Sequence, residues 1–239
     1  MKTFFSGLLF IYSAFSFATQ LAVENSWPPY ATINGSGYSV DIVKQAYKLV
    51  GEEIEFIVVP YSRALNMTLN DKVIGCFNVT KQADNSDVYY FGLTPILKAD
   101  SSFYLIRNSK KSYKKLSELP DGFKIGLIID YEYGDMYETH KSRFKESRVS
   151  SQKQIIQMLD LGRIDGAIMF DKVAKYTLMK MKKNINLISK KFLVHTSDIY
   201  VAFNKSNPKS RALAKLLDKG LALLKKNGDY KKIFSHKID

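Results

Sequence analysis

Apolar and polar residues follow two different rhythms in the first third of this chain. A period of two with β-branched side chains is typical of strands, whereas apolar residues three or four positions apart are typical of helices. The strand pattern covers residues 20–23, 53–60 and 72–79, and the helix pattern covers residues 40–50 and 62–69. The resulting order, strand–helix–strand–helix–strand, predicts an α/β fold with a mainly parallel sheet and helices on its faces.

The alternation restarts after a lysine-rich connector at residues 109–120. Two stretches, residues 65–75 and 157–166, also share one plan: a helix end, a polar turn and a buried strand that begins near a glycine. This similarity suggests two units of related architecture. We expect further strands at residues 88–91, 102–106, 123–129, 164–169, 185–187 and 197–203, and further helices at residues 134–144, 152–161, 171–181, 210–226 and 230–236.

The first 18 residues have the composition of a secretory signal peptide. Lys2 precedes an apolar stretch of about 14 residues, and the small residues Ser16 and Ala18 fit the cleavage site. A membrane-spanning helix needs about 20 apolar residues, so this stretch is too short for an anchor. The single cysteine, Cys76, lies in an apolar run and is expected to be buried, so no cysteine is placed to carry a lipid. We therefore expect a mature protein that is free in a Gram-negative periplasm.

The net charge of +13 raises the question of nucleic-acid binding, but the positions of the basic residues argue against it. Lysines occur as scattered short clusters beside helix ends and in polar loops, as on a solvated surface. The sequence also lacks the common signatures of catalysis: its three histidines are far apart, and neither a glycine-rich phosphate loop nor a Gly-x-Ser-x-Gly elbow occurs. We expect a monomer that is not an enzyme and needs neither a cofactor nor a metal ion.

Five short motifs occur along the chain in a specific order. They are E-N-S-W-P-P-Y at residues 24–30, G-x-G-Y-S-V-D-I-V at 35–43, V-P-Y-S-R-A-L at 59–65, L-x-x-G-R-I-D-G-A-I at 159–168 and N-G-D-Y-K-K-I at 227–233. In this order and spacing, the motifs resemble those of the family 3 extracellular solute-binding proteins of ABC transporters. These are polar amino-acid binders with the periplasmic binding protein-like type II fold. The resemblance extends over essentially all of the chain after residue 18.

The resemblance implies two α/β lobes that are joined by two hinge strands and close over a ligand in the cleft between them. Lobe 1 would comprise residues 19–104 and 200–239, and lobe 2 would comprise residues 105–199. The expected function is capture of a small polar solute, an amino acid or a related amine-bearing compound, for uptake through an inner-membrane ABC permease. Two alternatives stay open: a sensing module that presents the solute to a membrane receptor, and a dehydratase-like enzyme on the same fold.

In lobe 1, the resemblance assigns ligand contacts to residues near the ends of the first and third strands. Trp27 and Tyr30 fall where the family places an aromatic side chain that stacks on the ligand; alternatively, Trp27 packs beneath its own loop. Glu24 matches a position that contacts a cationic side chain in some members. Asn78 and Thr80 match the strand end where hydroxyl and backbone groups meet the ligand.

The sequence departs from the family where a carboxylate-binding arginine is expected. The family motif T-x-x-R is replaced here by Thr80-Lys81-Gln82-Ala83, which lacks the arginine that grips an α-carboxylate bidentately. Arg63, at the start of the helix after the second strand, is our candidate substitute and Lys81 is a weaker one, although Arg63 could equally serve the surface of its own helix. Otherwise the ligand is not an ordinary α-amino acid, because a buried carboxylate needs a partner.

In lobe 2, the loop at residues 130–134 matches the family's small-residue turn, which makes Tyr131 and Glu132 candidate contacts. Asp171 lies near the family's ammonium-binding aspartate, but the spacing is one residue longer than usual. Phe170 could therefore take that place while Asp171 caps its helix. An acidic cleft would favour a cationic or amine-bearing ligand over a dicarboxylate. The acids that could form it are Glu24, Asp130, Glu132 and Asp171.

Overall fold

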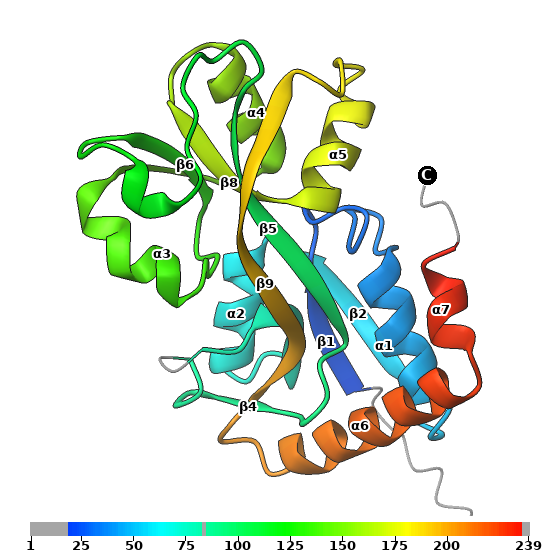
Figure 1. The fold of residues 1–239 in the computed structure, drawn as a ribbon. Helices are drawn as coiled ribbons and strands as arrows, with labels where there is room; N and C mark the ends of the chain where they lie inside the picture. The colour runs from blue at the N-terminus through cyan, green and yellow to red at the C-terminus, as the bar shows by residue number, and fades with distance from the viewer. Residues whose placement is uncertain (1–18, 83–84, 236–239) are drawn as a thin grey trace, which may run out of the picture.

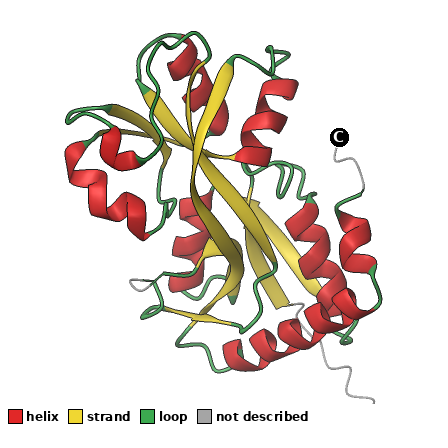
Figure 2. Ribbon diagram, viewed as in Figure 1, coloured by secondary structure: helices red, strands yellow, loops and turns green. Residues whose placement is uncertain are grey.

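A computed structural model of the chain describes residues 19–82 and 85–235. The predicted signal peptide at residues 1–18, together with Ala83 and His236, lies outside the described residues. Nine strands form one sheet with the order β2-β1-β3-β9-β5-β8-β6-β7, and β4 pairs with β9. Helices surround this sheet (Figure 1, Figure 2). The predicted α/β fold class is confirmed.

One end of the sheet, here called the β1 side, is built from segments near both ends of the chain. Strand β1 is central and pairs in parallel with β2 and β3. Every residue of β3 is buried, as expected for a central strand that is covered on both faces. The strands are β1 (Thr19–Glu24), β2 (Ile54–Val59), β3 (Gly75–Thr80) and β4 (Tyr89–Phe91), and the helices are α1 (Tyr38–Lys48), α2 (Tyr61–Leu69), α6 (Ser210–Lys226) and α7 (Asp229–Ile233).

The other end of the sheet, the β6 side, repeats this plan with residues from the middle of the chain. Strand β6 is central and pairs in parallel with β7 and β8. The strands are β6 (Lys124–Ile128), β7 (Lys145–Val149) and β8 (Gly166–Phe170), and the helices are α3 (Asp135–His140), α4 (Gln152–Asp160) and α5 (Asp171–Lys180), with short 3-10 turns at Leu116–Glu118 and Lys141–Arg143.

Two long strands, β5 (Leu97–Ile106) and β9 (Ile188–Asn204), link the two sides (Figure 1). They pair antiparallel along the whole of β5, while β9 also pairs with β3 and β5 also pairs with β8. The ladder between them is irregular at Ser101/Ser102 and at Phe103/Tyr104. Two lobes joined by two strands would have this arrangement. The residue bounds given above for the lobes stay a prediction.

Most predicted elements form, and the differences lie where the sequence pattern is least regular. The predicted strand at residues 185–187 is wrong, because these residues form a turn and bend and β9 begins at Ile188. The pattern misses β7, whose sequence K-E-S-R-V lies at the edge of the sheet and has no buried residue. The helix predicted at residues 134–144 ends at His140 and continues as a 3-10 turn.

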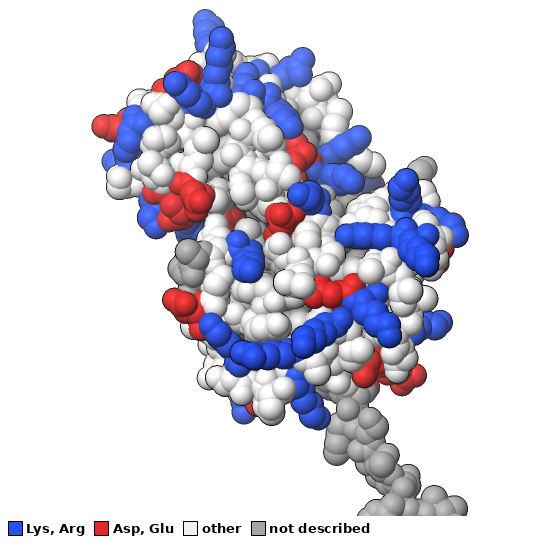
Figure 3. All heavy atoms as spheres, turned by 60° about the horizontal axis from the view of Figure 1, so that its bottom comes forward, with Lys and Arg blue, Asp and Glu red and all other residues white. Residues whose placement is uncertain are grey.

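A single hydrophobic core extends through both sides and includes Trp27, Tyr47 and Tyr137 among its largest fully buried side chains. Cys76 is also buried, as expected from its apolar neighbours. Lysine and arginine side chains are spread over both sides on the visible face, with acidic groups between them (Figure 3). In the part of the chain that the structure describes, no helix combines the length and apolar character needed to cross a membrane.

Helix α6 crosses α1 so closely that Gly220 has no room for a side chain. A Cβ atom at this position would lie 2.1 Å from the backbone oxygen of Ala46 in α1, so the helices would have to separate. We expect Gly220→Ala to lower the free energy of unfolding by about 1–3 kcal/mol, as overpacking does, although alanine is the better helix former. Urea unfolding measures the difference, with the exposed neighbour Lys219→Ala as the control. Equal midpoints for Gly220→Ala and the wild type would contradict this close packing.

Candidate functional site

Five of the predicted ligand residues meet in a small cavity between the β1 side and the β6 side. Strands β1 and β3 end on one side of this cavity, and β6 and β8 end on the other. Ligands of open α/β sheets bind at such carboxyl ends of strands. The cavity leaves only about 10 Å³ for the centre of a water molecule, which is room for a single water. Its walls are Trp27, Tyr61, Asn78, Thr80, Tyr131, Glu132 and Phe170.

The loop after β1 holds Trp27 and Tyr30 beside the cavity. It folds back on itself, because the N–H of Trp27 donates to the carbonyl of Ala31 (3.1 Å) and the N–H of Tyr30 donates to the carbonyl of Trp27 (2.9 Å). Gly37 allows this, since a Cβ there would lie 2.1 Å from the Tyr30 carbonyl oxygen. The ring of Trp27 stacks on Tyr30 with centroids 4.2 Å apart and meets Phe170 of β8 edge to face at 5.0 Å. The indole of Trp27 is 1% exposed, and it joins the two sides because it contacts Tyr30 on one side and Phe170 on the other.

Two tyrosine–glutamate hydrogen bonds connect the sides across the cavity. The hydroxyl of Tyr131, in the loop after β6, donates to the carboxyl of Glu24, the last residue of β1. In the opposite direction, the hydroxyl of Tyr61, the first residue of α2, donates to the carboxylate oxygens of Glu132 at 3.2 and 3.0 Å. The rings of Tyr61 and Tyr131 meet edge to face with centroids 4.9 Å apart. We call these four residues the latch, because each side contributes one acid and one phenol.

The loop that carries Tyr131 and Glu132 is held by its own neighbours. The N–H of Ile128 donates to the hydroxyl of Tyr133 at 2.7 Å. Arg148 of β7 donates to the carbonyls of Ile128 and Tyr131 at 3.2 and 3.4 Å. These bonds fix the direction in which the loop leaves β6, and they thereby orient Tyr131 toward the β1 side.

Burial controls the protonation of Glu24, which is 2% exposed. Removal from water is the main cause that raises the pKa of its carboxyl to about 8; the carboxylate of Glu132 acts in the same direction, and the hydrogen bond from Tyr131 opposes it. Burial also raises the pKa of Tyr61 and of Tyr131, so both hydroxyls stay protonated as donors. Glu24 is therefore largely neutral at pH 7.

Asn78 places a buried amide beside the latch. Its φ of +74° falls at the irregularity between Phe77 and Val79 in the β3–β9 ladder. The side chain is close enough to Glu24 to lower the pKa of that carboxyl, yet within the described residues neither amide atom has a partner in hydrogen-bonding geometry. An unpaired buried amide costs about 1–3 kcal/mol. A ligand that hydrogen-bonds to Asn78 would remove this cost.

Arg63, the candidate partner for a carboxylate, does not line the cavity. It is exposed on α2, two positions after Tyr61, and residues two positions apart on a helix point in different directions. Lys81 is also exposed, with its ammonium 5.9 Å from the centre of the Phe91 ring. Within the described residues, no cluster of His, Cys, Asp and Glu is arranged to hold a metal ion.

Asp171 is likewise occupied outside the cavity. It begins α5, where it accepts hydrogen bonds from the hydroxyl of Tyr104 (2.8 Å) and the ammonium of Lys190 (2.5 Å). Phe170, the alternative for this position, lines the cavity instead. Asp130 is exposed. The structure thus brings Glu24 and Glu132 together but leaves the other two acids of the predicted acidic cleft elsewhere.

Tyr61 is the latch residue that sequence reasoning misses. Its position was visible in the motif V-P-Y-S-R-A-L, where it directly follows the proline that ends the second strand. A residue at the junction of a strand and the next helix lies at the carboxyl end of the strand, where the other site residues lie. Arg63 carries the charge in the same motif, but Tyr61 lies closer to the end of the strand.

The family model of the bacterial extracellular solute-binding proteins, family 3, matches residues 19–236. No curated protein matches. A mutant of the arginine-binding protein ArgBP from T. maritima is 19% identical, with a TM-score of 0.77 over 92% of this chain and 96% of that chain.

Two further solved structures have the same fold. A histidine kinase sensor domain with similarity to periplasmic binding proteins is 16% identical, with a TM-score of 0.77 over 91% of this chain and 94% of that chain. The amino acid ABC transporter substrate-binding protein AbpA from Streptococcus pneumoniae, bound to L-arginine, is 19% identical, with a TM-score of 0.75 over 91% of this chain and 93% of that chain. At identities this low, the similarity of the structures shows a shared fold and nothing more specific.

Proposed function

Because this chain belongs to the bacterial extracellular solute-binding proteins, family 3, we propose that it captures a small polar solute between its two sides and releases it unchanged. The latch carries this proposal: hydrogen-bonded pairs from opposite sides meet at the carboxyl ends of the strands. Opening of the two lobes about β5 and β9 would break both pairs and expose the latch to water. A solute that enters replaces these contacts and closes the lobes over itself.

The solute occupies space that the latch fills in the closed structure. A cavity with about 10 Å³ for a water centre cannot hold an amino acid, since sites for small molecules measure about 300–1,000 Å³. Tyr61 and Tyr131 donate the hydrogen bonds that cross between the sides, and a solute displaces these side chains. The hydrogen bonds between the sides thus compete with the solute for the same groups.

An amine-bearing solute fits the chemistry of the cavity best. Glu132 lines the cavity, and the buried carboxyl of Glu24 is hydrogen-bonded to the lining residue Tyr131. The rings of Trp27 and Phe170 attract cations. The residues that line the cavity include neither lysine nor arginine, so a buried α-carboxylate would lack the cation that offsets its desolvation. The structures with this fold include ArgBP and an AbpA bound to L-arginine, whose side chain is a cation, and this supports a cationic solute.

A thermal-shift screen of residues 19–239 against amino acids, polyamines, small peptides and organic acids tests this proposal. We expect amines to raise the melting temperature by a few degrees, because a ligand at 100 times its Kd adds about 2.7 kcal/mol of stability. Glu132→Gln is expected to weaken binding about tenfold or more, whereas the exposed neighbour Asp130→Asn changes it less than about twofold. No response to the whole panel, or a response to dicarboxylates alone, would overturn the proposal.

We further propose that residues 1–18 direct the protein to the periplasm and that it acts there as a monomer. It then delivers its solute to an inner-membrane ABC permease. The family and the similar structures are binding proteins, which supports binding without catalysis. Purification of the secreted protein and sequencing of its N-terminus tests the first step, since cleavage after Ala18 leaves Thr19 as the first residue.

A sensing role is the second candidate. The observation that favours it is the similarity in fold to the histidine kinase sensor domain. In that role, the closed form with solute would bind a membrane receptor instead of a permease. Neighbouring genes for a permease and an ATPase would favour transport, and a neighbouring kinase or cyclase would favour sensing.

A further inference from the structure

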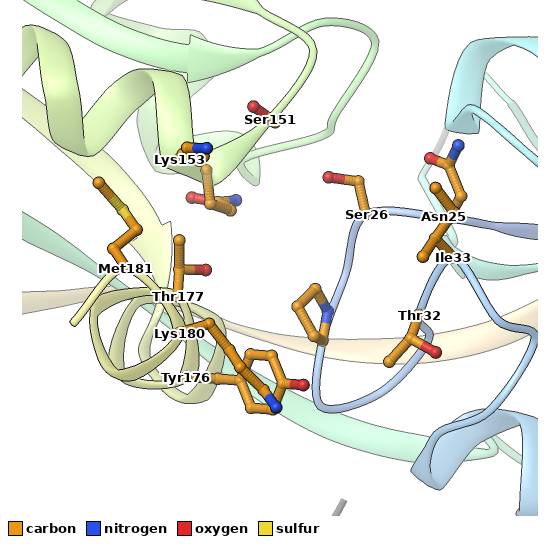
Figure 4. Close-up of a pocket in the computed structure, with 12 residues that line it drawn as sticks. Asn25, Ser26, Thr32, Ile33, Ser151, Lys153, Tyr176, Thr177, Lys180 and Met181 are labelled. Carbon is orange, nitrogen blue, oxygen red and sulfur yellow. The ribbon is translucent and has the colours of Figure 1, made fainter. Parts of the chain in front are cut away.

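A second cavity, here called the rim pocket, lies between the same two sides but apart from the latch. Its walls come from the loop after β1 and from helices α4 and α5 (Figure 4). It leaves about 350 Å³ for the centre of a water molecule, against about 10 Å³ in the latch cavity. This volume lies within the range of small-molecule sites. The two cavities share no lining residue.

Gln152 is the observation that points to a ligand in the rim pocket. It is the first residue of α4, lines the pocket and is 2% exposed. Neither its amide nitrogen nor its amide oxygen has a hydrogen-bond partner within the described part of the chain. Burial of an amide with both ends unpaired is unfavourable, and an apolar side chain of the same size would avoid it. A ligand that hydrogen-bonds to the amide would remove this cost and would explain why a glutamine occupies the position.

The groups around Gln152 favour an anion. The first N–H groups of a helix have no partner within the helix and carry partial positive charge, and α4 begins at the pocket wall. Its N-cap, Ser151, accepts a hydrogen bond from the N–H of Gln154 and donates one to the side-chain oxygen of the same residue. Lys153 and Lys180 line the pocket, and no Asp or Glu is among its lining residues. Positive charge in this pocket is therefore not offset by an acid in its walls.

Hydroxyl groups from both sides face the same space. Figure 4 shows Ser26, on the loop after β1, across the opening from Thr177 of α5, whereas the hydroxyl of Ser151 is bonded to Gln154. Hydroxyls and helix N–H groups are common donors to carboxylate and phosphate oxygens. We propose that the rim pocket binds a small molecule through a carboxylate or phosphate group. Because the pocket walls belong to both sides, this anion favours the closed arrangement of the lobes.

Calorimetric titration of residues 19–239 with inorganic phosphate, sulfate, acetate and citrate at constant ionic strength tests the proposal. We expect at least one of these anions to bind with a Kd below about 1 mM. Gln152→Leu and Lys153→Met are each expected to raise that Kd about tenfold, whereas Lys175→Met, on the exposed face of α5, changes it less than about twofold. Gln152→Leu should keep or raise the melting temperature, which separates lost binding from lost folding.

The choice of anions distinguishes a phosphate ligand from a carboxylate ligand. Binding of phosphate and sulfate alone identifies a phosphate group as the ligand chemistry, and binding of acetate or citrate alone identifies a carboxylate. Absence of binding by all four anions at 10 mM overturns the proposal, as does an equal Kd for Gln152→Leu and the wild type. The titration contains no amine, so the rim pocket and the latch site can fail independently.

Discussion

Raising the pH from about 5 to about 8 is expected to destabilise the ligand-free protein by up to about 1.4 kcal/mol for each pH unit. The cause is Glu24, whose pKa rises from the ordinary 4.5 to about 8 in the folded protein because its carboxyl is buried. Between these values the folded state keeps a proton that the unfolded state has lost. The stabilisation is fully present below pH 4.5 and is lost as the pH rises through 8.

Urea unfolding at a series of pH values measures this dependence. Glu24→Gln keeps an acceptor for the hydroxyl of Tyr131 but carries no titrating proton, so its stability is expected to lack the contribution of this group. Glu53→Gln removes an exposed carboxylate of the same type and is expected to keep the wild-type dependence. A wild-type stability that does not fall between pH 5 and pH 8 would contradict a neutral Glu24.

Trp27→Ala is expected to reduce the free energy of unfolding by about 3–5 kcal/mol and to abolish solute binding. The indole is 1% exposed, stacks on Tyr30 and meets Phe170 from the opposite side of the molecule. Its removal opens a cavity in the core and takes away one wall of the latch cavity. Trp27→Phe retains an aromatic ring and is expected to keep most of both properties.

The two effects of Trp27→Ala are measured separately, by urea unfolding and by calorimetric titration with the best amine from the screen. Phe170→Ala removes the other half of the contact and should weaken binding as well. Full binding by Trp27→Ala at a temperature where it is folded would show that the ring serves only the core.

The sequence pattern predicts the helices better than the strands at the edge of the sheet. Helix α6 forms at the predicted residues 210–226, because its apolar stripe is long and regular. Strand β7 carries three charged residues in five and is held by pairing with β6, which a local pattern does not contain. The predicted strand at residues 185–187 has apolar residues of the right kind, but it lies in the turn before β9.

The site is predictable to the level of strand ends but not of side-chain directions. Glu24 and Tyr131 are 107 positions apart, and their contact depends on how the two sides close. A shift of one or two residues also changes the direction of a side chain: Phe170 faces the cavity while Asp171 does not, and Tyr61 faces it while Arg63 does not. The resemblance indicates segments that meet at the cavity, and packing determines which side chains of these segments face it.

The path of the chain through β5 and β9 sets the order in which the two sides can be completed during synthesis. Strands β5 to β8 lie within residues 97–170, so the sheet of the β6 side can pair as soon as this stretch has left the ribosome. The β1 side is synthesised first but is completed later. Its strand β3 pairs with β9, and its helix α1 packs against Gly220 of α6. Its apolar surfaces stay uncovered until β9 and α6 have been made. The sheet of the β6 side can therefore be complete before that of the earlier-made β1 side, in reverse of the usual N-terminal-first order.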